Sequence, residues 1–252
     1  MVPQLTVIGI TDIPEVNEGD DLAGFIFRAA LAQGTPIYLN DVLVITQKIV
    51  SKAEGAVVDL REIEPSPLAK QFAKQYDKDP RHIEVVLRQT RRIVRMDRGI
   101  LIVESKHGFI SANAGVDASN IPGEHRVSLL PEDPDSSARH LRKELMDLAG
   151  GHLSVIISDT FGRPWRNGNT DIAIGVAGIN PLRDYRGTID PHGYSLKVSL
   201  AAIADQIASA AELVAGKTSQ IPVSIVRGYP HSPDEDATVK PLLRESSLDL
   251  FR

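Results

Sequence analysis

Val155-Ile156-Ile157-Ser158-Asp159-Thr160-Phe161-Gly162-Arg163 places an acidic side chain two residues after a short apolar run. An uninterrupted apolar run of this length is typical of a strand buried on both faces, so residues 153–157 are predicted to form one. Val42-Leu43-Val44-Ile45 is a second run of the same kind. Together the two runs predict a sheet at the centre of the fold, with Asp159 where one of its strands ends.

The other predicted elements mix helices and strands without a regular alternation. Further strands are predicted over residues 5–10, 99–103, 109–112 and 222–226, and helices over residues 20–34, 65–76, 80–90, 133–148 and 195–215. Residues 47–55 are predicted to form a polar turn, and residues 232–252 a polar tail. This order predicts an α/β or α+β protein with mixed sheets and flanking helices.

Length and composition restrict the class of protein. The 252 residues suit a single domain over residues 1–252, built as one body or as two closely joined lobes with a crossing near residues 121–135. The net charge of −5 argues against a nucleic-acid partner. Because cysteine is absent, disulfides, thiolate metal sites and cysteine nucleophiles are excluded. A cytoplasmic protein with no membrane partner is expected, because the sequence shows no signal peptide and no run of about 18 apolar residues.

Two carboxylates are the leading candidates for a functional site. Asp117 lies in Ser111-Ala112-Asn113-Ala114-Gly115-Val116-Asp117-Ala118-Ser119-Asn120, and like Asp159 it follows an apolar segment. A carboxylate at such a place costs free energy unless water, a cation or a hydrogen-bond donor meets it. The pair is therefore predicted either to bind a hard cation such as Mg²⁺, with Thr160 adding an oxygen ligand, or to cap turns. Asn113 and Asn120 fit ligand binding and turn formation equally.

Basic side chains lie near the same stretches. Arg163 and Arg166 fit a site for phosphate or carboxylate oxygens, and they fit a solvated surface loop equally. Lys48 and Lys52 follow the buried strand 42–45, where loops of mixed sheets often bind ligands. They are candidates for neutralising a nucleotide phosphate, although a surface lysine is the simpler interpretation of each one alone.

Six groups of residues, in order along nearly the whole chain, carry a family resemblance. They are Glu18–Leu22, Val50–Gly55, Asn113–Asn120, Leu130-Pro131 with Asp133–Asp135, Ile157–Arg163, and Ile221–Val223 with Val226–Gly228. In these motifs the chain resembles the coenzyme F420-0:L-glutamate ligase family, also called F420 gamma-glutamyl ligases. Each motif is short, but their order and spacing together are specific.

The resemblance implies a GTP-dependent ligase that forms an amide bond between L-glutamate and coenzyme F420-0, either once or with further gamma-linked glutamates. It implies that Asp117, Asp159 and Thr160 hold divalent cations, two Mg²⁺ or Mn²⁺ ions, with K⁺ as an additional ion. It implies nucleotide contacts from Asp12, Ile13, Pro14, Glu15, Gln47, Lys48, Lys52, Asn120 and the loop Gly216, Lys217, Thr218, Ser219 and Gln220. The match is weakest in this loop, because the family's loop is often acidic and glycine-rich whereas this chain has Lys217-Thr218-Ser219.

The resemblance also implies an intertwined α/β homodimer. Some relatives carry an additional C-terminal flavin-type reductase domain, which is expected to be absent because the sequence ends at Arg252. No base-reading motif decides between GTP and ATP.

The chemistry expected of such an enzyme follows from the poor reactivity of a carboxylate toward an amine. Transfer of the terminal phosphoryl group of GTP to the precursor's carboxylate makes an acyl phosphate, which the glutamate amine then attacks. Asp117, Asp159, Lys52 and Arg163 are the expected catalytic residues. The alternative is a metal-dependent phosphotransferase or amide ligase that acts on another acceptor.

Overall fold

A mixed five-stranded sheet forms the centre of the computed structural model, which describes residues 2–121 and 123–250. Its strand order is β1-β12-β2-β8-β9. The strands are β1 (Thr6–Ile10), β12 (Val223–Arg227), β2 (Val42–Thr46), β8 (Ser154–Arg163) and β9 (Arg166–Ala177). Only β2 and β8 pair in parallel, and the other neighbours are antiparallel. The mixed sheet and both buried strands predicted from the apolar runs are confirmed.

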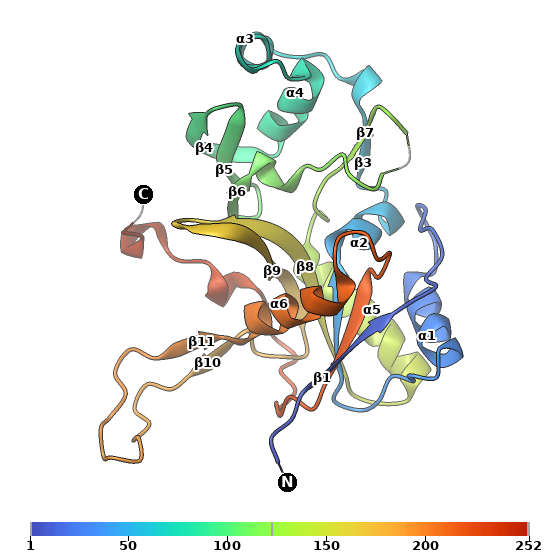
Figure 1. Cartoon of the computed structure of the whole chain (residues 1–252), viewed down its shortest axis with the longest axis vertical. Helices are drawn as coiled ribbons and strands as arrows, with labels where there is room; N and C mark the ends of the chain where they lie inside the picture. Colours follow the sequence, from blue (N-terminus) through green and yellow to red (C-terminus); the bar gives the residue numbers. More distant parts are fainter. Residues whose placement is uncertain (1, 122, 251–252) are drawn as a thin grey trace.

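Helices cover both faces of this sheet (Figure 1). On one face α1 (Leu22–Ala32) and α5 (Pro134–Ala149) pack on Leu43, Ile45, Val155 and Ile157. On the other face α6 (Ile203–Ala215) packs on the alternate side chains, among them Val44 and Ile156. Because successive strand side chains point to opposite faces, a run such as Val155-Ile156-Ile157 supplies both cores.

Residues 57–121 and 123–128 form a second unit with its own hydrophobic core, here called the upper lobe (Figure 1). The five-stranded sheet and the helices that cover it are called the central lobe. The helices of the upper lobe are α3 (Pro67–Tyr76) and α4 (Pro80–Arg88), and its strands are β3 (Val57–Asp59), β4 (Thr90–Asp97), β5 (Ile100–Ser105), β6 (Ile110–Ala112) and β7 (Arg126–Ser128). Short 3₁₀ turns lie at Leu60–Glu62 and Asn113–Gly115. Its core contains Phe72, Val86 and Leu101. The chain enters this lobe through β3 and returns through β7, which pair with each other.

Helix starts follow local chemistry. Asp21, Ser66, Asp79 and Asp133 each accept a hydrogen bond from a backbone N–H of the first helical turn, and proline opens α3, α4 and α5. Helix α5 ends at Gly150, whose φ of 75° is the left-handed conformation that glycine adopts without strain. These signals are local, which is why the predicted helices 65–76, 80–90 and 133–148 are confirmed to within two residues.

Two predicted elements are wrong. The predicted turn over 47–55 is the helix α2 (Gln47–Ala53), because Ile49 and Val50 turn into the core and Gly55 ends the helix. The predicted helix 195–215 begins only at Ile203, because residues 200–202 form the strand β11 (Leu200–Ala202) and pair with β10 (Leu182–Asp184). The segment between β10 and β11 projects away from the body as an extended ribbon (Figure 1).

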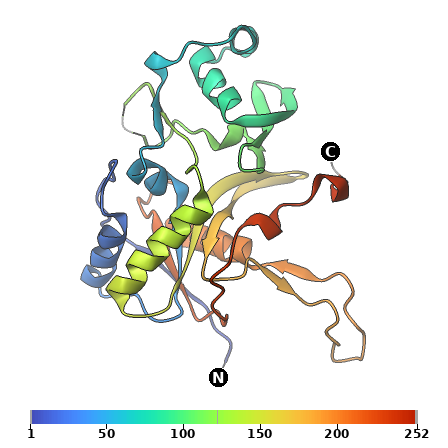
Figure 2. The same ribbon diagram turned by 180° about the vertical axis from the view of Figure 1, so that it is seen from behind.

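Residues 232–250 of the predicted polar tail pack along the side of the central sheet that carries α5 (Figure 2), and residues 251–252 lie outside the described part of the chain. The tail contains short 3₁₀ turns at Lys240–Leu242 and Ser246–Leu248, and it buries Ala237 and Val239. Asp135 of α5 accepts a hydrogen bond from the Val239 N–H at 3.0 Å.

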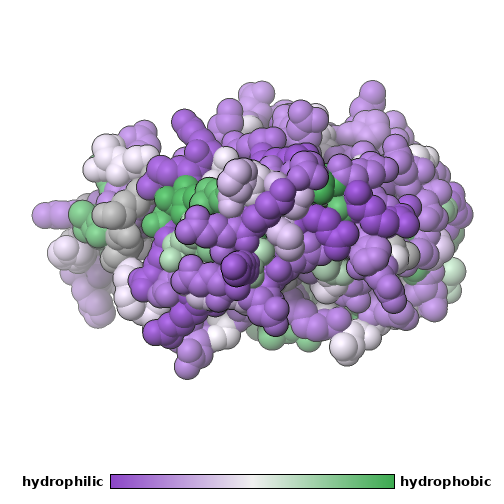
Figure 3. Space-filling model, turned by 90° about the horizontal axis from the view of Figure 1, so that it is seen from above, coloured by the Kyte–Doolittle hydropathy of each residue, from purple (hydrophilic) through white to green (hydrophobic). Residues whose placement is uncertain are grey.

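The face of the molecule in Figure 3 is mainly hydrophilic, with small hydrophobic patches. Among the described residues, no helix has the length and hydropathy required to cross a membrane.

Candidate active site

The parallel pair β2 and β8 brings two candidate segments to one edge of the sheet. Thr46 at the end of β2 pairs with Ser158 of β8, so α2 begins beside Asp159. Polar residues that follow neighbouring parallel strands meet at the same edge, which is where open α/β sheets commonly bind ligands. This pairing places Gln47 and Lys48 next to Asp159.

Asp117 reaches this edge from the upper lobe. Its backbone pairs with Ser128, and its carboxylate accepts hydrogen bonds from the Ser119 N–H at 2.7 Å and the Ser119 hydroxyl at 2.9 Å. The Lys48 ammonium lies 2.8 Å from Oδ2 of Asp117. Burial opposes ionisation of Asp117, but hydrogen bonds from Lys48 and Ser119 prevail and hold its pKa below the ordinary value. Asp117 is therefore a carboxylate in the neutral pH range.

Asp159 has a different environment. It lies within β8 rather than after its end, which corrects the sequence interpretation: β8 continues to Arg163 because it pairs with β9, with a register shift after Ile157. Burial raises its pKa to about 7, the Thr160 N–H opposes this rise, and the negative charges of Asp171 and Asp117 add to it. Lys48 acts in the opposite direction. The charges of Asp171, Asp117 and Lys48 therefore all act on Asp159.

Thr160 faces the other side of β8. Its hydroxyl donates to Oδ1 of Asp171, its directly opposite partner on β9, at 2.6 Å. The Lys217 ammonium lies 2.6 Å from the Thr160 hydroxyl, 2.9 Å from Oε1 of Glu212 and 3.5 Å from Oδ1 of Asp171. Because adjacent strand side chains alternate, the Thr160 hydroxyl and the Asp159 carboxylate point to opposite faces of the sheet.

Asp171 and Glu212 are two residues of this cluster that were not predicted from the sequence. Asp171 directly precedes the apolar run 172–174, so an acidic residue beside an apolar run, the signal that identified Asp159, is present there too. Glu212 has no such signal, because an exposed helical position is the ordinary place for glutamate. Its role depends on α6 packing against β9, where its carboxylate accepts the Asp171 N–H at 2.9 Å.

The residues predicted to contact a nucleotide lie near this edge or beside α1. Lys52 is nearly buried and its ammonium lies 2.6 Å from Oε1 of Glu15, which ties the segment 12–15 to α2. Gln47 is 1% exposed, and its side-chain nitrogen has no hydrogen-bond partner among the described residues although its oxygen accepts the Ser51 hydroxyl. A buried donor without a partner is costly, so the site can accept a polar ligand atom there.

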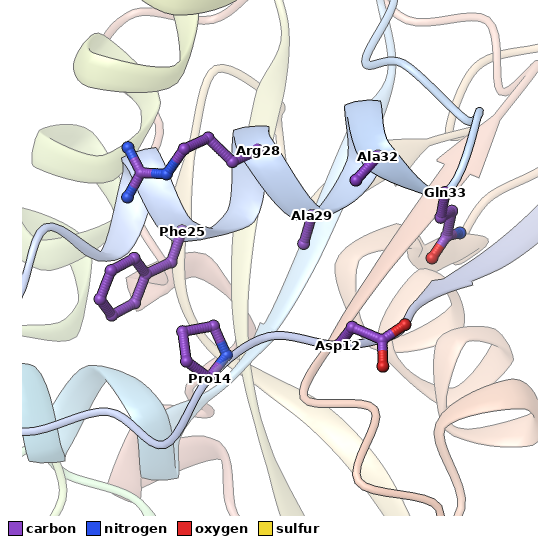
Figure 4. Close-up of a pocket in the computed structure, with 7 residues that line it drawn as sticks. All are labelled: Asp12, Pro14, Phe25, Arg28, Ala29, Ala32 and Gln33. Atoms are coloured by element: carbon purple, nitrogen blue, oxygen red, sulfur yellow. The ribbon is translucent and has the colours of Figure 1, made fainter.

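A pocket of about 410 Å³ lies between the segment that follows β1 and helix α1. Figure 4 shows the rings of Pro14 and Phe25 at one end and the polar groups of Asp12 and Gln33 at the other. Ile13 packs against the core between them. Within the predicted segment 12–15, Asp12 and Pro14 therefore line this pocket, whereas Glu15 contacts Lys52.

The other predicted residues contact groups other than the carboxylates of Asp117 and Asp159. Arg163 and Arg166 are exposed and flank the tip of the β8–β9 hairpin, which replaces the expected loop, and Arg163 donates to the carbonyl of Asn167. Asn120 is exposed in a turn with a φ of 57°. Residues 216–220 follow α6, and within them Lys217 is the residue whose side chain reaches β8.

The donors at the edge fit a single hard cation. Among the described residues, no three acidic or histidine side chains gather closely enough to form a complete protein cage. Mg²⁺ does not need one, because it usually takes one or two carboxylates and completes its coordination with water and substrate phosphate. Asp117 and Asp159 supply two carboxylates, and a cation there would offset the burial and the charge repulsion that raise the Asp159 pKa.

Comparisons with known proteins show the family of the chain. A family model described as F420-0:gamma-glutamyl ligase matches residues 10–228. Proteins named Coenzyme F420:L-glutamate ligase are 42% identical in Methanothermobacter thermautotrophicus, over 98% of this chain and 99% of the relative, and 44% identical in Methanopyrus kandleri, over 98% and 99%. The protein of that name in Methanocaldococcus jannaschii is 43% identical over 99% of this chain and 97% of its own. The chain therefore belongs to the F420-0:gamma-glutamyl ligase family.

Proposed function

We propose that the chain is a GTP-dependent ligase that joins L-glutamate to coenzyme F420-0 by an amide bond in F420 biosynthesis, and adds further gamma-linked glutamates. Full-length similarity to proteins named Coenzyme F420:L-glutamate ligase supports the substrates. The observation that carries the proposal is the ion pair of Lys48 with Asp117 at the end of the parallel strand pair, where the charges of both residues act on Asp159. Such an arrangement suits binding of phosphate groups together with a cation.

The proposed reaction has two steps. A carboxylate oxygen of the precursor attacks the terminal phosphorus of GTP, the bond to the bridging oxygen breaks, and GDP leaves. The amine nitrogen of glutamate then attacks the acyl carbon, the bond to the phosphate oxygen breaks, and inorganic phosphate leaves as the nitrogen loses its proton. The acyl phosphate is needed because a free carboxylate is a poor electrophile.

Each residue of the site has a role in this scheme. Asp117 and Asp159 would hold Mg²⁺ or Mn²⁺, with K⁺ as an additional ion in the site. A divalent cation bound by them would supply positive charge for the phosphate oxygens. Lys48 and Lys52 add positive charge around the phosphates, and each must exchange its present carboxylate partner, Asp117 or Glu15, for a phosphate oxygen.

The remaining predicted residues position substrates. Gln47, Asn120, residues 12–15 and residues 216–220 contact the nucleotide, and the unpartnered nitrogen of Gln47 supports this role. Arg163 holds an anionic group of the precursor or of glutamate at the hairpin tip, where its guanidinium is exposed. Arginine suits this task because its planar donors match two oxygens of a carboxylate or phosphate.

The active form is proposed to be a homodimer. The ribbon between β10 and β11 exposes Ile189, Tyr194 and Val198, which are 72%, 59% and 88% exposed. A two-stranded ribbon is marginally stable alone, so a second copy of the chain is a suitable support for these side chains. Sedimentation equilibrium should give twice the chain mass, and a shift to the monomer is expected for Ile189→Lys combined with Val198→Lys. A monomer in the unaltered protein contradicts the dimer.

The ligase proposal is tested by incubating the protein with F420-0, L-glutamate, Mn²⁺ and either GTP or ATP, followed by mass spectrometry. The expected product is heavier than F420-0 by glutamyl units, with one phosphate released per unit and GTP preferred. Phosphate release without a glutamyl product would support the alternative acceptor. If the protein releases no phosphate and forms no glutamyl product, that result would contradict an enzymatic role in this reaction.

A further inference from the structure

The acidic groups near β8 are divided between its two sides. The Lys48–Asp117 ion pair lies on the side of the Asp159 carboxylate, whereas Asp171 and Glu212 lie on the other side with the Thr160 hydroxyl. The charge of Asp171 nevertheless reaches Asp159, because it adds to the rise of the Asp159 pKa. The second side already holds a positive charge, because the Lys217 ammonium contacts all three of these groups.

This contact is more than a single surface ion pair. Isolated exposed pairs contribute little to stability, and the Lys217 side chain is 59% exposed. Its two carboxylate partners, however, are only 14% and 21% exposed, and each is held by another group: Asp171 by the Thr160 hydroxyl, and Glu212 by the Asp171 N–H. The acceptors are therefore preorganised around one ammonium position.

We propose that Lys217 supplies a tethered positive charge on the Thr160 side of β8, so that each chain binds one divalent cation where the acidic groups would otherwise accommodate two. The inference rests on the proposed function, which places a cation between Asp117 and Asp159. A divalent ion on the Thr160 side must displace the ammonium from Thr160, Asp171 and Glu212 together, and it then lies beside a displaced positive charge. A divalent ion between Asp117 and Asp159 has to displace Lys48 from a single carboxylate, that of Asp117. Lys217 is thus a residue that determines cation stoichiometry.

The test counts Mn²⁺ bound per chain in the presence of saturating GDP, using the electron paramagnetic resonance signal of free Mn²⁺. One Mn²⁺ is expected in the unaltered protein and two in Lys217→Gln, with the second ion bound at least about tenfold more tightly than in the unaltered protein. Lys217→Arg keeps the charge and should return the count to one. Lys143→Gln changes an exposed lysine on α5 and serves as the matched control, with an expected count of one.

The outcomes separate this inference from the proposed function. Two ions in the unaltered protein, or one ion in Lys217→Gln, would overturn the role of Lys217 while leaving a cation on Asp117 and Asp159. No bound ion in the unaltered protein would remove the cation site of the proposed function, and the inference with it. Circular dichroism of each variant establishes that the count is measured on folded protein.

Discussion

The Lys48 ammonium lies 2.8 Å from Oδ2 of Asp117, and this ion pair connects helix α2 of the central lobe to the loop after β6 in the upper lobe. The edge-to-face contact of Phe109 with Phe161, at 6.2 Å between ring centres, joins the same two bodies. The candidate site is therefore built across the junction of the lobes. Its geometry depends on how they pack as well as on its own side chains.

Replacing either carboxylate should remove most of the activity. Asp117→Asn and Asp159→Asn keep the side-chain shape and remove the negative charge, so each is expected to lower glutamate-dependent phosphate release from GTP by about 100-fold or more. Steady-state phosphate release and product mass measure this loss. Asp147→Asn, an exposed carboxylate on α5, should retain full activity. Full turnover of both site variants would exclude the paired-carboxylate cation site.

Asp159 should make the cation-free protein less stable as pH rises. Its folded pKa of about 7 lies above the ordinary value of 3.8 for an aspartate, so the folded state holds the proton more tightly. The resulting stabilisation is complete below about pH 4 and is lost as pH rises through about 7. Asp159→Asn should weaken this dependence and raise Tm at pH 8, by about 2–4 °C for each kcal/mol gained. Thermal unfolding in EDTA between pH 5 and pH 8 measures how Tm of each protein depends on pH. Parallel curves of Tm against pH for the unaltered protein and Asp159→Asn would contradict the raised pKa of Asp159.

Arg142 should be important for holding the C-terminal segment. It is 7% exposed, donates to the Leu153 carbonyl at 2.8 Å, and pairs with both carboxylate oxygens of Glu235 at 2.6 and 2.7 Å. Arg142→Ala leaves a buried carbonyl without its donor, so the free energy of unfolding should fall by about 2–4 kcal/mol. Urea unfolding measures the change. Arg139→Ala, an exposed arginine on the same helix, should change it little, and equal losses in the two variants would refute the role of Arg142.

Gly175 should not tolerate a side chain. A Cβ added there would collide with the backbone carbonyl of Pro134, where α5 begins against β9. Because backbone cannot move aside cheaply, Gly175→Ala should lower the free energy of unfolding by about 1–3 kcal/mol. Gly162→Ala on β8 is the matched control, since the nearest atom would be 3.9 Å away. Equal unfolding midpoints in the two variants would disagree with this close packing.

The elements predicted correctly depend on neighbouring residues. The strands over 42–45 and 153–157 follow from uninterrupted apolar runs, and α3, α4 and α5 follow from a capping side chain with proline directly after it. Their signals lie within a few residues of each element. The helix predicted over 195–202 fails for the opposite reason, because pairing of β11 with β10 across a long connection outweighs local preference.

The sequence by itself determined the mixed α/β class, the central buried strands, most helix ends and, through its ordered motifs, the family. Only the tertiary structure decided which polar groups share a side of β8. The register shift after Ile157 and the pairing of Thr160 with Asp171 place the Thr160 hydroxyl on the other face of the sheet from the Asp159 carboxylate. Packing of α6 against β9 then brings Lys217 and Glu212 to the Thr160 side. Register and helix packing join residues distant in the chain, and a shift of one residue changes the face of every side chain.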